Sequence, residues 1–189
     1  MENIIKSVAL LLEKKPDAVI AIDGPCASGK TTLARLLAEK FRIQVIHMDD
    51  FFLPAALRTE ERLAEHGGNV HYERFCKEVV SGIKSGKAFE YRAYSCRTGD
   101  YKETKKISPH QAILVEGSYS LHPEFSEIYD MKIFVVADPE TRHERILQRN
   151  GETALETFKS LWIPLEDKYF EHFGIMKNCD IILKTDQKQ

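Results

Sequence analysis

The sequence has few cysteines, and no two of them stand close together. Cys26, Cys76, Cys96 and Cys179 form no C-x-x-C pair, so neither a zinc site nor a disulfide framework is expected. The seven histidines also lack the paired spacing of metal ligands. These absences favour reduced thiols and a cytoplasmic location.

The sequence also has no large excess of one charge and no long apolar run. The formal net charge is −2, which gives no general attraction to nucleic acid or to an anionic membrane. No apolar run approaches the roughly 20 residues that cross a bilayer, and the N-terminal segment carries charges throughout, unlike a secretory signal. Neither a repeat nor a linker interrupts the chain, so we predict a single domain over residues 1–189.

Apolar patterns predict alternating helices and strands. Residues 1–15 have helical spacing and predict an amphipathic helix, which either packs on the domain or forms a homodimer contact. Continuous apolar runs predict buried strands at residues 18–24, 43–52, 112–117, 131–138 and 179–184. Helical patterns follow at 33–41, 71–84 and 152–173, and residues 87–107 suit a β-hairpin. The alternation predicts an α/β fold with a central parallel sheet covered on both faces.

A glycine-bounded turn follows the first predicted strand. Its sequence, GPCASGKT, fits the pattern G-x-x-x-x-G-K-[ST] at every fixed position. The glycines let backbone N–H groups turn toward a phosphate, Lys30 adds positive charge, and the Thr31 hydroxyl can bind Mg²⁺. The next helix presents its positive N-terminal end to the same anion. We therefore expect ATP and Mg²⁺ to bind at Gly24, Pro25, Cys26, Ala27, Ser28, Gly29, Lys30, Thr31 and Thr32, with Thr32 as the alternative hydroxyl.

Acidic residues end two of the predicted strands. Asp49 and Asp50 follow the apolar part of the second strand, and Glu116 ends the third. In sheets of this kind the carboxyl ends of the strands face the ligand. Transfer of a phosphoryl group to an alcohol needs a base for the hydroxyl proton and oxygen ligands for Mg²⁺. These carboxylates can divide the two tasks, and the base is either Asp49 or Asp50.

Three arginines lie on one side of the helix predicted after Asp138-Pro139. Arg142, Arg145 and Arg149 fall within about 60° of one another at helical spacing. A row of guanidinium groups beside a phosphate site is typical of a flap that closes over phosphates and excludes water. We therefore predict a lid over residues 140–155.

These segments resemble the uridine kinase and phosphoribulokinase branch of P-loop kinases. The resemblance rests on GPCASGKTT, MDDFF, ILVEG and DPETRHERILQRN and extends over residues 19–183. It implies a P-loop NTPase kinase fold with a substrate-side β-hairpin and a short arginine lid. It further implies the roles of five positions: Asp49 as catalytic aspartate, Thr31 and Glu116 at the Mg²⁺ ion, and Arg145 and Arg149 in the lid.

The substrate side departs from this family's pattern. Phe52 stands where the family has an aromatic residue beside the bound nucleoside, usually tyrosine. Phe89 and Tyr94 stand where uridine-cytidine kinases carry the tyrosine and histidine that recognise the pyrimidine, and His71 is a further candidate contact. The resemblance therefore implies phosphoryl transfer to a nucleoside-like small molecule, with uridine or cytidine as the first expectation.

Other functions stay open from the sequence alone. The acceptor could instead be nicotinamide riboside, pantothenate or a similar small alcohol. A nucleotide-binding regulatory module is a different class, and the D-x-x-G and N-K-x-D signatures of GTPase switches are absent. An inactive scaffold is disfavoured because Lys30, Thr31, Asp49 and Glu116 are all present.

Overall fold

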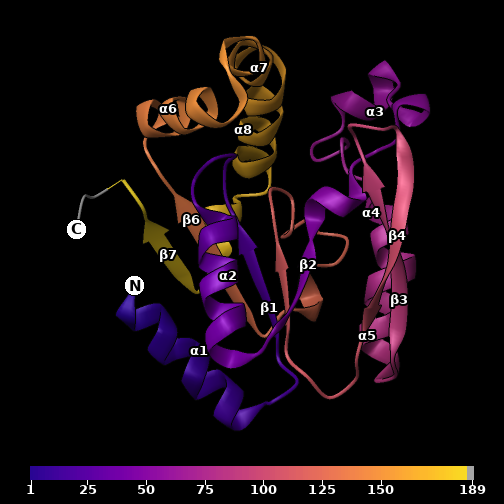
Figure 1. Cartoon of the computed structure of the whole chain (residues 1–189), viewed down its shortest axis with the longest axis vertical. Helices are drawn as coiled ribbons and strands as arrows, with labels where there is room; N and C mark the ends of the chain where they lie inside the picture. The colour runs from indigo at the N-terminus through magenta and orange to yellow at the C-terminus, as the bar shows by residue number, and fades with distance from the viewer. Residues whose placement is uncertain (187–189) are drawn as a thin grey trace.

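A parallel sheet of five strands forms the centre of the protein. The computed structural model describes residues 1–186. The strand order is β2-β5-β1-β6-β7, and every neighbouring pair runs parallel. The strands span, in chain order, β1 Val19–Asp23, β2 Gln44–His47, β5 Ile113–Glu116, β6 Met131–Val136 and β7 Ile181–Lys184. This confirms the α/β class and the central parallel sheet (Figure 1).

Both faces of the sheet are covered, as the continuous apolar strands predict. Ile20 and Ile22 of β1 pack with the apolar sides of α1 (Glu2–Lys14) and α2 (Lys30–Phe41). Val19 and Ala21 point to the opposite face, because successive strand residues alternate. There they join a core that includes Tyr169 of α8 (Ile163–His172).

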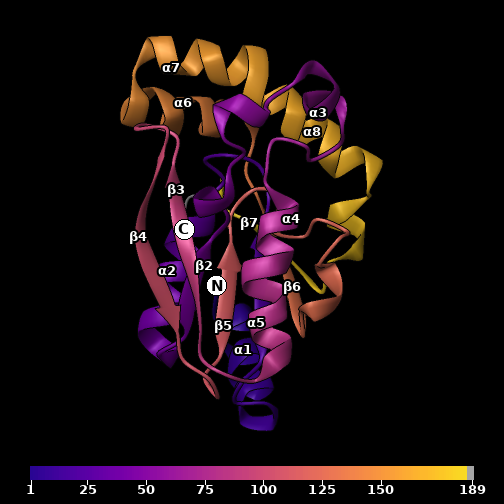
Figure 2. The same cartoon turned by 90° about the vertical axis from the view of Figure 1, so that its right-hand side faces the viewer.

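A long helix and a hairpin stand at the β2 side of the sheet. The helix runs through α4 (Tyr72–Phe75), a π-helical turn (Cys76–Val80) and α5 (Ser81–Ser85). The hairpin joins β3 (Phe89–Ser95) to β4 (Asp100–Ile107), with one irregularity in register between Arg92 and Tyr94. Figure 2 shows the hairpin and the helix from the side, with the sheet beyond them.

Three helices lie above the carboxyl ends of the strands in Figure 1. They are α6 (Pro139–Asn150), α7 (Glu152–Thr157) and α8, with a π-helical turn at Phe158–Trp162. Asp138 occupies the N-cap position of α6, and Pro139 starts the helix, where its missing N–H has no consequence. The predicted lid region therefore corresponds to α6 and the start of α7. Within residues 1–186, no helix has the length and apolar character to cross a membrane.

The second strand is shorter than its sequence pattern predicts. It ends at His47, and Met48–Phe51 form a 3-10 helix. Such a helix has about three residues per turn, so Met48 and Phe51 both point into the core, where each is fully buried. Asp49 and Asp50 lie between them on this turn. The segment between this turn and α4 holds a 3-10 turn at Ala55–Leu57 and the short helix α3 (Glu60–Ala64).

Candidate active site

The phosphate-binding loop connects β1 to α2. Gly24 has φ 140°, and a Cβ atom at this position would lie 2.0 Å from the carbonyl oxygen of Val135 on β6. Gly29 has φ 103°, in the region that favours glycine. The loop can therefore pass close to the sheet and turn into α2 only with glycine at these two positions.

Lys30 is the first residue of α2, and its buried side chain folds back onto this loop. Its Nζ donates hydrogen bonds to the carbonyl oxygens of Gly24 at 2.7 Å and Pro25 at 2.8 Å. The Ser118 Oγ lies 3.3 Å away, on the segment that follows β5. The ammonium group is thus held at the point where β1, the loop and the end of β5 meet.

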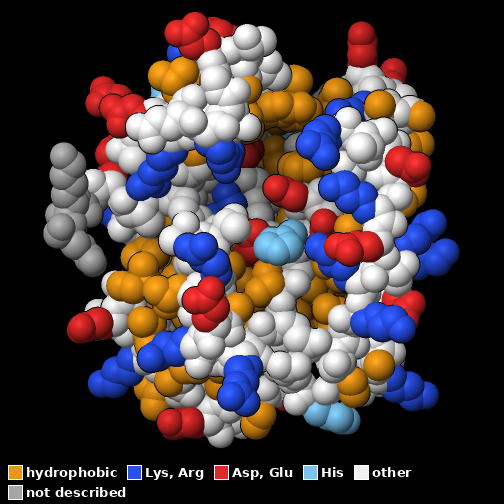
Figure 3. Space-filling model, in the orientation of Figure 1, with side chains coloured by type: hydrophobic (Ala, Val, Ile, Leu, Met, Phe, Trp, Pro, Cys, Tyr) orange, Lys and Arg blue, Asp and Glu red, His pale blue; other side chains and the backbone are white. Residues whose placement is uncertain are grey.

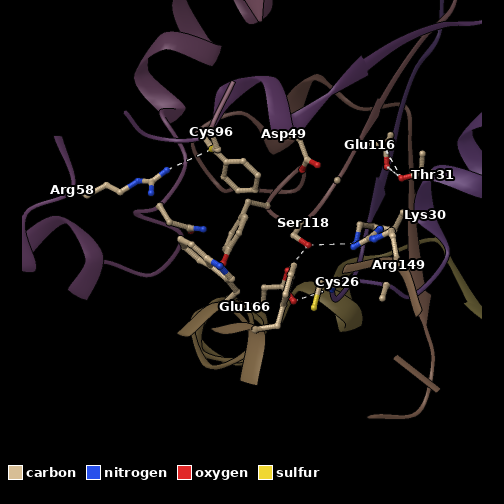
Figure 4. A pocket seen from close by; sticks show the side chains of 17 residues that line it. Cys26, Lys30, Thr31, Asp49, Arg58, Cys96, Glu116, Ser118, Arg149 and Glu166 are labelled. Carbon is tan, nitrogen blue, oxygen red and sulfur yellow. Dashed lines mark hydrogen bonds between the residues drawn. The ribbon is translucent and has the colours of Figure 1, made fainter. Parts of the chain in front are cut away.

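A cavity of about 270 Å³ opens beside Lys30. Figure 4 shows Lys30, Thr31, Glu116 and Arg149 gathered at one end and Arg58 with Cys96 at the other. The remaining lining side chains include Asp49, Phe52, Asn69, Tyr119, Trp162 and Glu166. On the surface, basic side chains gather near the centre of this face, below α6 and beside α3, with acidic ones among them (Figure 3).

A second cavity of about 420 Å³, called the outer cavity below, lies beside the phosphate-binding loop. Its lining includes Gly29, Thr32, Arg145, Arg149 and Thr185. Lys30 and Thr31 line both cavities, so the two spaces share the same cationic and hydroxyl groups.

The two adjacent aspartates have different environments. The Asp50 Oδ2 accepts hydrogen bonds from the Tyr91 hydroxyl at 3.1 Å and from Lys105 Nζ at 2.8 Å, so this carboxylate is bound to the hairpin. Asp49 instead lines the cavity with solvent-exposed surface. Desolvation by surrounding protein and the negative charge of Glu116 raise the Asp49 pKa, while Lys30 lowers it. Of the pair, Asp49 lines the cavity and Asp50 does not.

Glu116 and Thr31 bring two oxygen groups together beside the phosphate-binding loop. The Thr31 Oγ1 lies 3.2 Å from Glu116 Oε2, and His47 Nδ1 lies 2.5 Å from Glu116 Oε1. The hydrogen bond to Glu116 raises the pKa of His47. Hard oxygen atoms suit Mg²⁺, which retains several water ligands and takes few from protein. A hydroxyl and a carboxylate beside the phosphate-binding loop therefore fit this ion.

Sequence reasoning missed Glu166, a buried carboxylate on α8. Its Oε2 accepts a hydrogen bond from the Cys26 N–H at 2.8 Å, and its Oε1 accepts one from Ser118 Oγ at 2.7 Å. Glu166 and Tyr169 are both buried and lie three residues apart, on the inner face of α8. That spacing was the available signal, because an acidic residue on an apolar helix face needs a polar partner.

The three arginines of α6 have three different roles in the structure. Arg142 is buried, and its Nε donates to the Cys26 carbonyl oxygen at 3.1 Å. Arg145 donates to the carbonyl oxygens of Ala27 and Thr185, both at 3.0 Å. The Nε of Arg149 bonds only to the neighbouring Asn150, and its side chain lines both cavities. The helix is fastened to the phosphate-binding loop by two arginines, which leaves Arg149 available to a ligand.

Of the four expected substrate residues, only Phe52 lines the cavity. Phe89 lies at the far end of the hairpin, against Gly82, where a Cβ atom would be 2.3 Å from its ring. The buried Tyr94 packs edge-on against Tyr101. His71 is the N-cap of α4.

The rest of the cavity wall comes from residues to which sequence reasoning assigned no role. They include Arg58, Asn69, Cys96, Tyr119, Phe158 and Trp162, in addition to Glu166. Most lie in loops and turns, where hydrophobic periodicity gives no information.

Asp23 joins the parts of the site below the cavity. This fully buried carboxylate accepts hydrogen bonds from the backbone N–H groups of Gly24, Tyr119 and Leu121 and from the Tyr169 hydroxyl, at 2.7 to 3.1 Å. Burial raises its pKa to about 6. One side chain thereby fixes the phosphate-binding loop, the segment after β5 and α8 relative to one another.

Comparison with known proteins gives consistent matches. Residues 19–153 match the Phosphoribulokinase / Uridine kinase family. Uridine kinase-like protein 4 of Arabidopsis thaliana is 29% identical over 87% of this chain, which spans 38% of the length of that relative. A uridine kinase of Ligilactobacillus salivarius is 26% identical, with 84% of this chain and 81% of the relative covered.

A solved structure matches nearly the whole chain. It is that of a possible uridine kinase from Bacillus stearothermophilus, with a TM-score of 0.72, 23% identity and coverage of 97% of this chain and 96% of that one. At this identity the match supports the fold alone.

Proposed function

Because the chain belongs to the phosphoribulokinase and uridine kinase family, we propose that it transfers the γ-phosphoryl group of ATP to a hydroxyl of a small nucleoside-like molecule. The observation that carries this proposal is the position of Asp49. It lines a cavity that also contains Lys30 and the Thr31–Glu116 pair. A base, a phosphate site and oxygen donors for Mg²⁺ therefore meet at one cavity, which is what phosphoryl transfer to an alcohol requires.

The nucleotide binds with its phosphates on the loop amides and Lys30 in this proposal. The outer cavity, lined by Thr32, Arg145 and Thr185, offers space for the nucleoside part of ATP. Lys30 leaves its carbonyl partners for the phosphate oxygens, and Arg149 approaches the transferring group from α6. Thr31 and Glu116 would hold a Mg²⁺ ion, which would supply positive charge to the phosphates when bound.

The acceptor binds in the cavity of about 270 Å³ that Asp49 lines, called the inner cavity below. Asp49 accepts the proton of the attacking hydroxyl, and its raised pKa brings its basicity closer to neutral pH. Phe52 and Trp162 offer aromatic surfaces for a planar base. The names of the relatives from Arabidopsis and Ligilactobacillus support uridine as the first acceptor to test. Cytidine is tested beside it, as the sequence resemblance implies. Nicotinamide riboside and pantothenate are the next.

Acceptor-stimulated formation of ADP tests this function. ATP and Mg²⁺ are incubated with the protein and, separately, uridine, cytidine, nicotinamide riboside, pantothenate and simple sugars. One acceptor should stimulate ADP formation strongly, and Asp49→Asn should abolish that stimulation while retaining ATP binding. Tight ATP binding without stimulation by any acceptor would instead indicate a regulatory nucleotide-binding module.

A further inference from the structure

One residue of the phosphate-binding loop has an unfavourable backbone conformation. Ala27 has φ 58°, in the left-handed region that residues with a side chain rarely adopt. Such a conformation persists only where the surrounding structure holds it. The shape of the loop therefore depends on contacts from other parts of the chain.

Three side chains outside the loop bind its backbone at and beside Ala27. Glu166 Oε2 on α8 accepts a hydrogen bond from the Cys26 N–H at 2.8 Å. On α6, Arg142 Nε donates to the Cys26 carbonyl oxygen at 3.1 Å, and Arg145 donates to the Ala27 carbonyl oxygen at 3.0 Å. Both backbone polar groups of Cys26 are thus bound, one by α6 and the other by α8.

Glu166 also reaches the loop lysine through a serine. Its Oε1 accepts a hydrogen bond from Ser118 Oγ at 2.7 Å, and that oxygen lies 3.3 Å from Lys30 Nζ. Figure 4 shows Glu166 between Cys26 and Ser118, with Lys30 beyond the serine. Since Glu166 is only 5% exposed, its carboxylate depends on these protein contacts more than on water.

These contacts fall on the part of the loop that faces the acceptor. Cys26 lines the inner cavity together with Asp49, whereas Gly29 and Thr32 line only the outer cavity. With the nucleoside part of ATP in the outer cavity, the terminal phosphate lies toward the inner one. Glu166 therefore binds the loop at the end where the transferring phosphate would lie.

We propose that Glu166 is a positioning residue for phosphoryl transfer. Through the Cys26 N–H and Ser118 it fixes the inner-cavity end of the loop and the ammonium group of Lys30. It thereby sets the distance from the terminal phosphate to the hydroxyl that Asp49 serves, without contacting either reactant. Misplacement by about 1 Å can lower a rate about 10²-fold. This inference rests on the proposed kinase function and adds a residue to that same site.

Two conservative substitutions separate the reach of this side chain from its charge. Glu166→Gln keeps the length and both contacts, because its amide oxygen can accept from the Cys26 N–H and its NH₂ group can donate to Ser118 Oγ. The Ser118 proton then goes to the Gly24 carbonyl oxygen, 3.1 Å away. Glu166→Asp keeps the carboxylate but is one methylene shorter and cannot hold both contacts. Glu171→Asp is the control, because Glu171 is exposed on the same helix.

Turnover should fall only in the shortened variant. With the best acceptor, Glu166→Asp should lower kcat about ten- to a hundredfold, with the Kd of ADP and the KM of the acceptor changed less than about threefold. Glu166→Gln and Glu171→Asp should stay within about threefold of wild type in all three quantities. Hydrogen exchange of the peptide that contains Cys26 gives a second readout, independent of activity. It should be faster in Glu166→Asp alone, because the Cys26 N–H loses its acceptor.

Three results would overturn the positioning role while the kinase function stands. An equal loss of kcat in both Glu166 variants would show that the charge matters rather than the reach. A parallel loss of kcat and ADP affinity in Glu166→Asp, with a lower melting temperature, would show a general role in folding of the loop. Wild-type kcat in Glu166→Asp would show that the contacts have no part in transfer. If the wild type phosphorylates no acceptor, the proposed function fails, and this inference with it.

Discussion

The neighbouring residues Asp49 and Asp50 have the same side chain but different contacts, and these contacts determine what each can do. Both belong to the same 3-10 turn, but Asp50 pairs with Lys105 and Tyr91 of the hairpin. Asp49 faces the cavity. The sequence MDDFF could not separate them, because nothing in the order of residues states which carboxylate meets the hairpin lysine.

Exchange of each carboxylate for an amide should separate the two roles. Asp49→Asn should lower kcat by about 10²- to 10⁴-fold, the typical contribution of a positioned base, with ATP affinity retained. Asp50→Asn, the matched control, should retain most turnover and lower the melting temperature, since it weakens the ion pair with Lys105. Turnover kinetics, ATP titration and thermal unfolding measure the three quantities. Equal loss of turnover in both variants would contradict the assignment of the base.

Glu116 should determine the requirement for Mg²⁺. Glu116→Gln keeps the side-chain shape near Thr31 and removes the negative charge that binds a cation. We expect the Mg²⁺ concentration for half-maximal activity to rise about tenfold or more, by analogy with losses seen when metal-site partners are removed. A magnesium titration at saturating ATP measures the shift. Unchanged magnesium dependence would place the ion elsewhere.

Helix α6 shows that residues on one side of a helix can still have different neighbours and different roles. Helical spacing correctly places the three arginines on one side, but their neighbours differ. Arg142 is 7% exposed and bonds to Cys26, whereas Arg149 is exposed and makes no bond beyond Asn150 within the described residues. One residue of the row holds the loop, and another remains free for a ligand.

Two substitutions on this helix should therefore affect different properties, one turnover and the other stability. Arg149→Ala should lower kcat at least tenfold and leave the melting temperature unchanged, since it removes a charge beside the transferring group. Arg142→Ala should lower the melting temperature, because it leaves a buried carbonyl without its donor. Kinetics and thermal unfolding of both variants distinguish these outcomes. A lower melting temperature in Arg149→Ala, without one in Arg142→Ala, would show that Arg149 rather than Arg142 stabilises the fold and would contradict these roles.

Elements with continuous or periodic apolar patterns could be predicted from sequence. The strands of the sheet, the N-terminal helix and the hairpin fall close to the expected positions, because burial on two faces or one leaves a clear pattern. The acceptor side could not be predicted in this way. Tyr119 and Asn69 lie on irregular segments, and Trp162 lies on a π-helical turn. Their positions depend on how the segment after β5 meets α8, which is a tertiary contact.

At the scale of the whole molecule, His122 joins three parts of the chain. Its ring stacks on Tyr72 of α4 at 4.7 Å between centroids, and it lies against Phe125 and Phe173. Burial and the nearby Arg62 charge lower its pKa to about 4. The folded state therefore prefers the neutral ring.

Acid should destabilise the protein through this histidine. The contribution of the neutral His122 ring to the free energy of unfolding is fully present above pH 6.5, the ordinary pKa of histidine. It is lost as the pH falls toward 4. The shift corresponds to about 3 kcal/mol of unfolding free energy. Asp23, whose pKa is raised to about 6, has the opposite effect, because its protonation favours the folded state as the pH falls below 6. The effect of His122 is therefore isolated by comparing wild type with His122→Gln. The stability difference between wild type and His122→Gln should shift by about 3 kcal/mol against wild type from pH 7 to pH 4. Urea unfolding at both pH values measures it, and a constant difference would contradict the pKa assignment.

The proposed function depends on transfer of the phosphoryl group itself to the acceptor. The most direct test uses ATP labelled with ¹⁸O in the terminal γ-phosphate oxygens, incubated with Mg²⁺, the protein and the acceptor that best stimulates ADP formation. Mass spectrometry then locates the label. Phosphoryl transfer predicts a phosphorylated acceptor that carries the labelled oxygens, in amounts equal to the ADP formed and absent with Asp49→Asn. Label found only in inorganic phosphate would show that the protein hydrolyses ATP without an acceptor and would contradict the proposed kinase function.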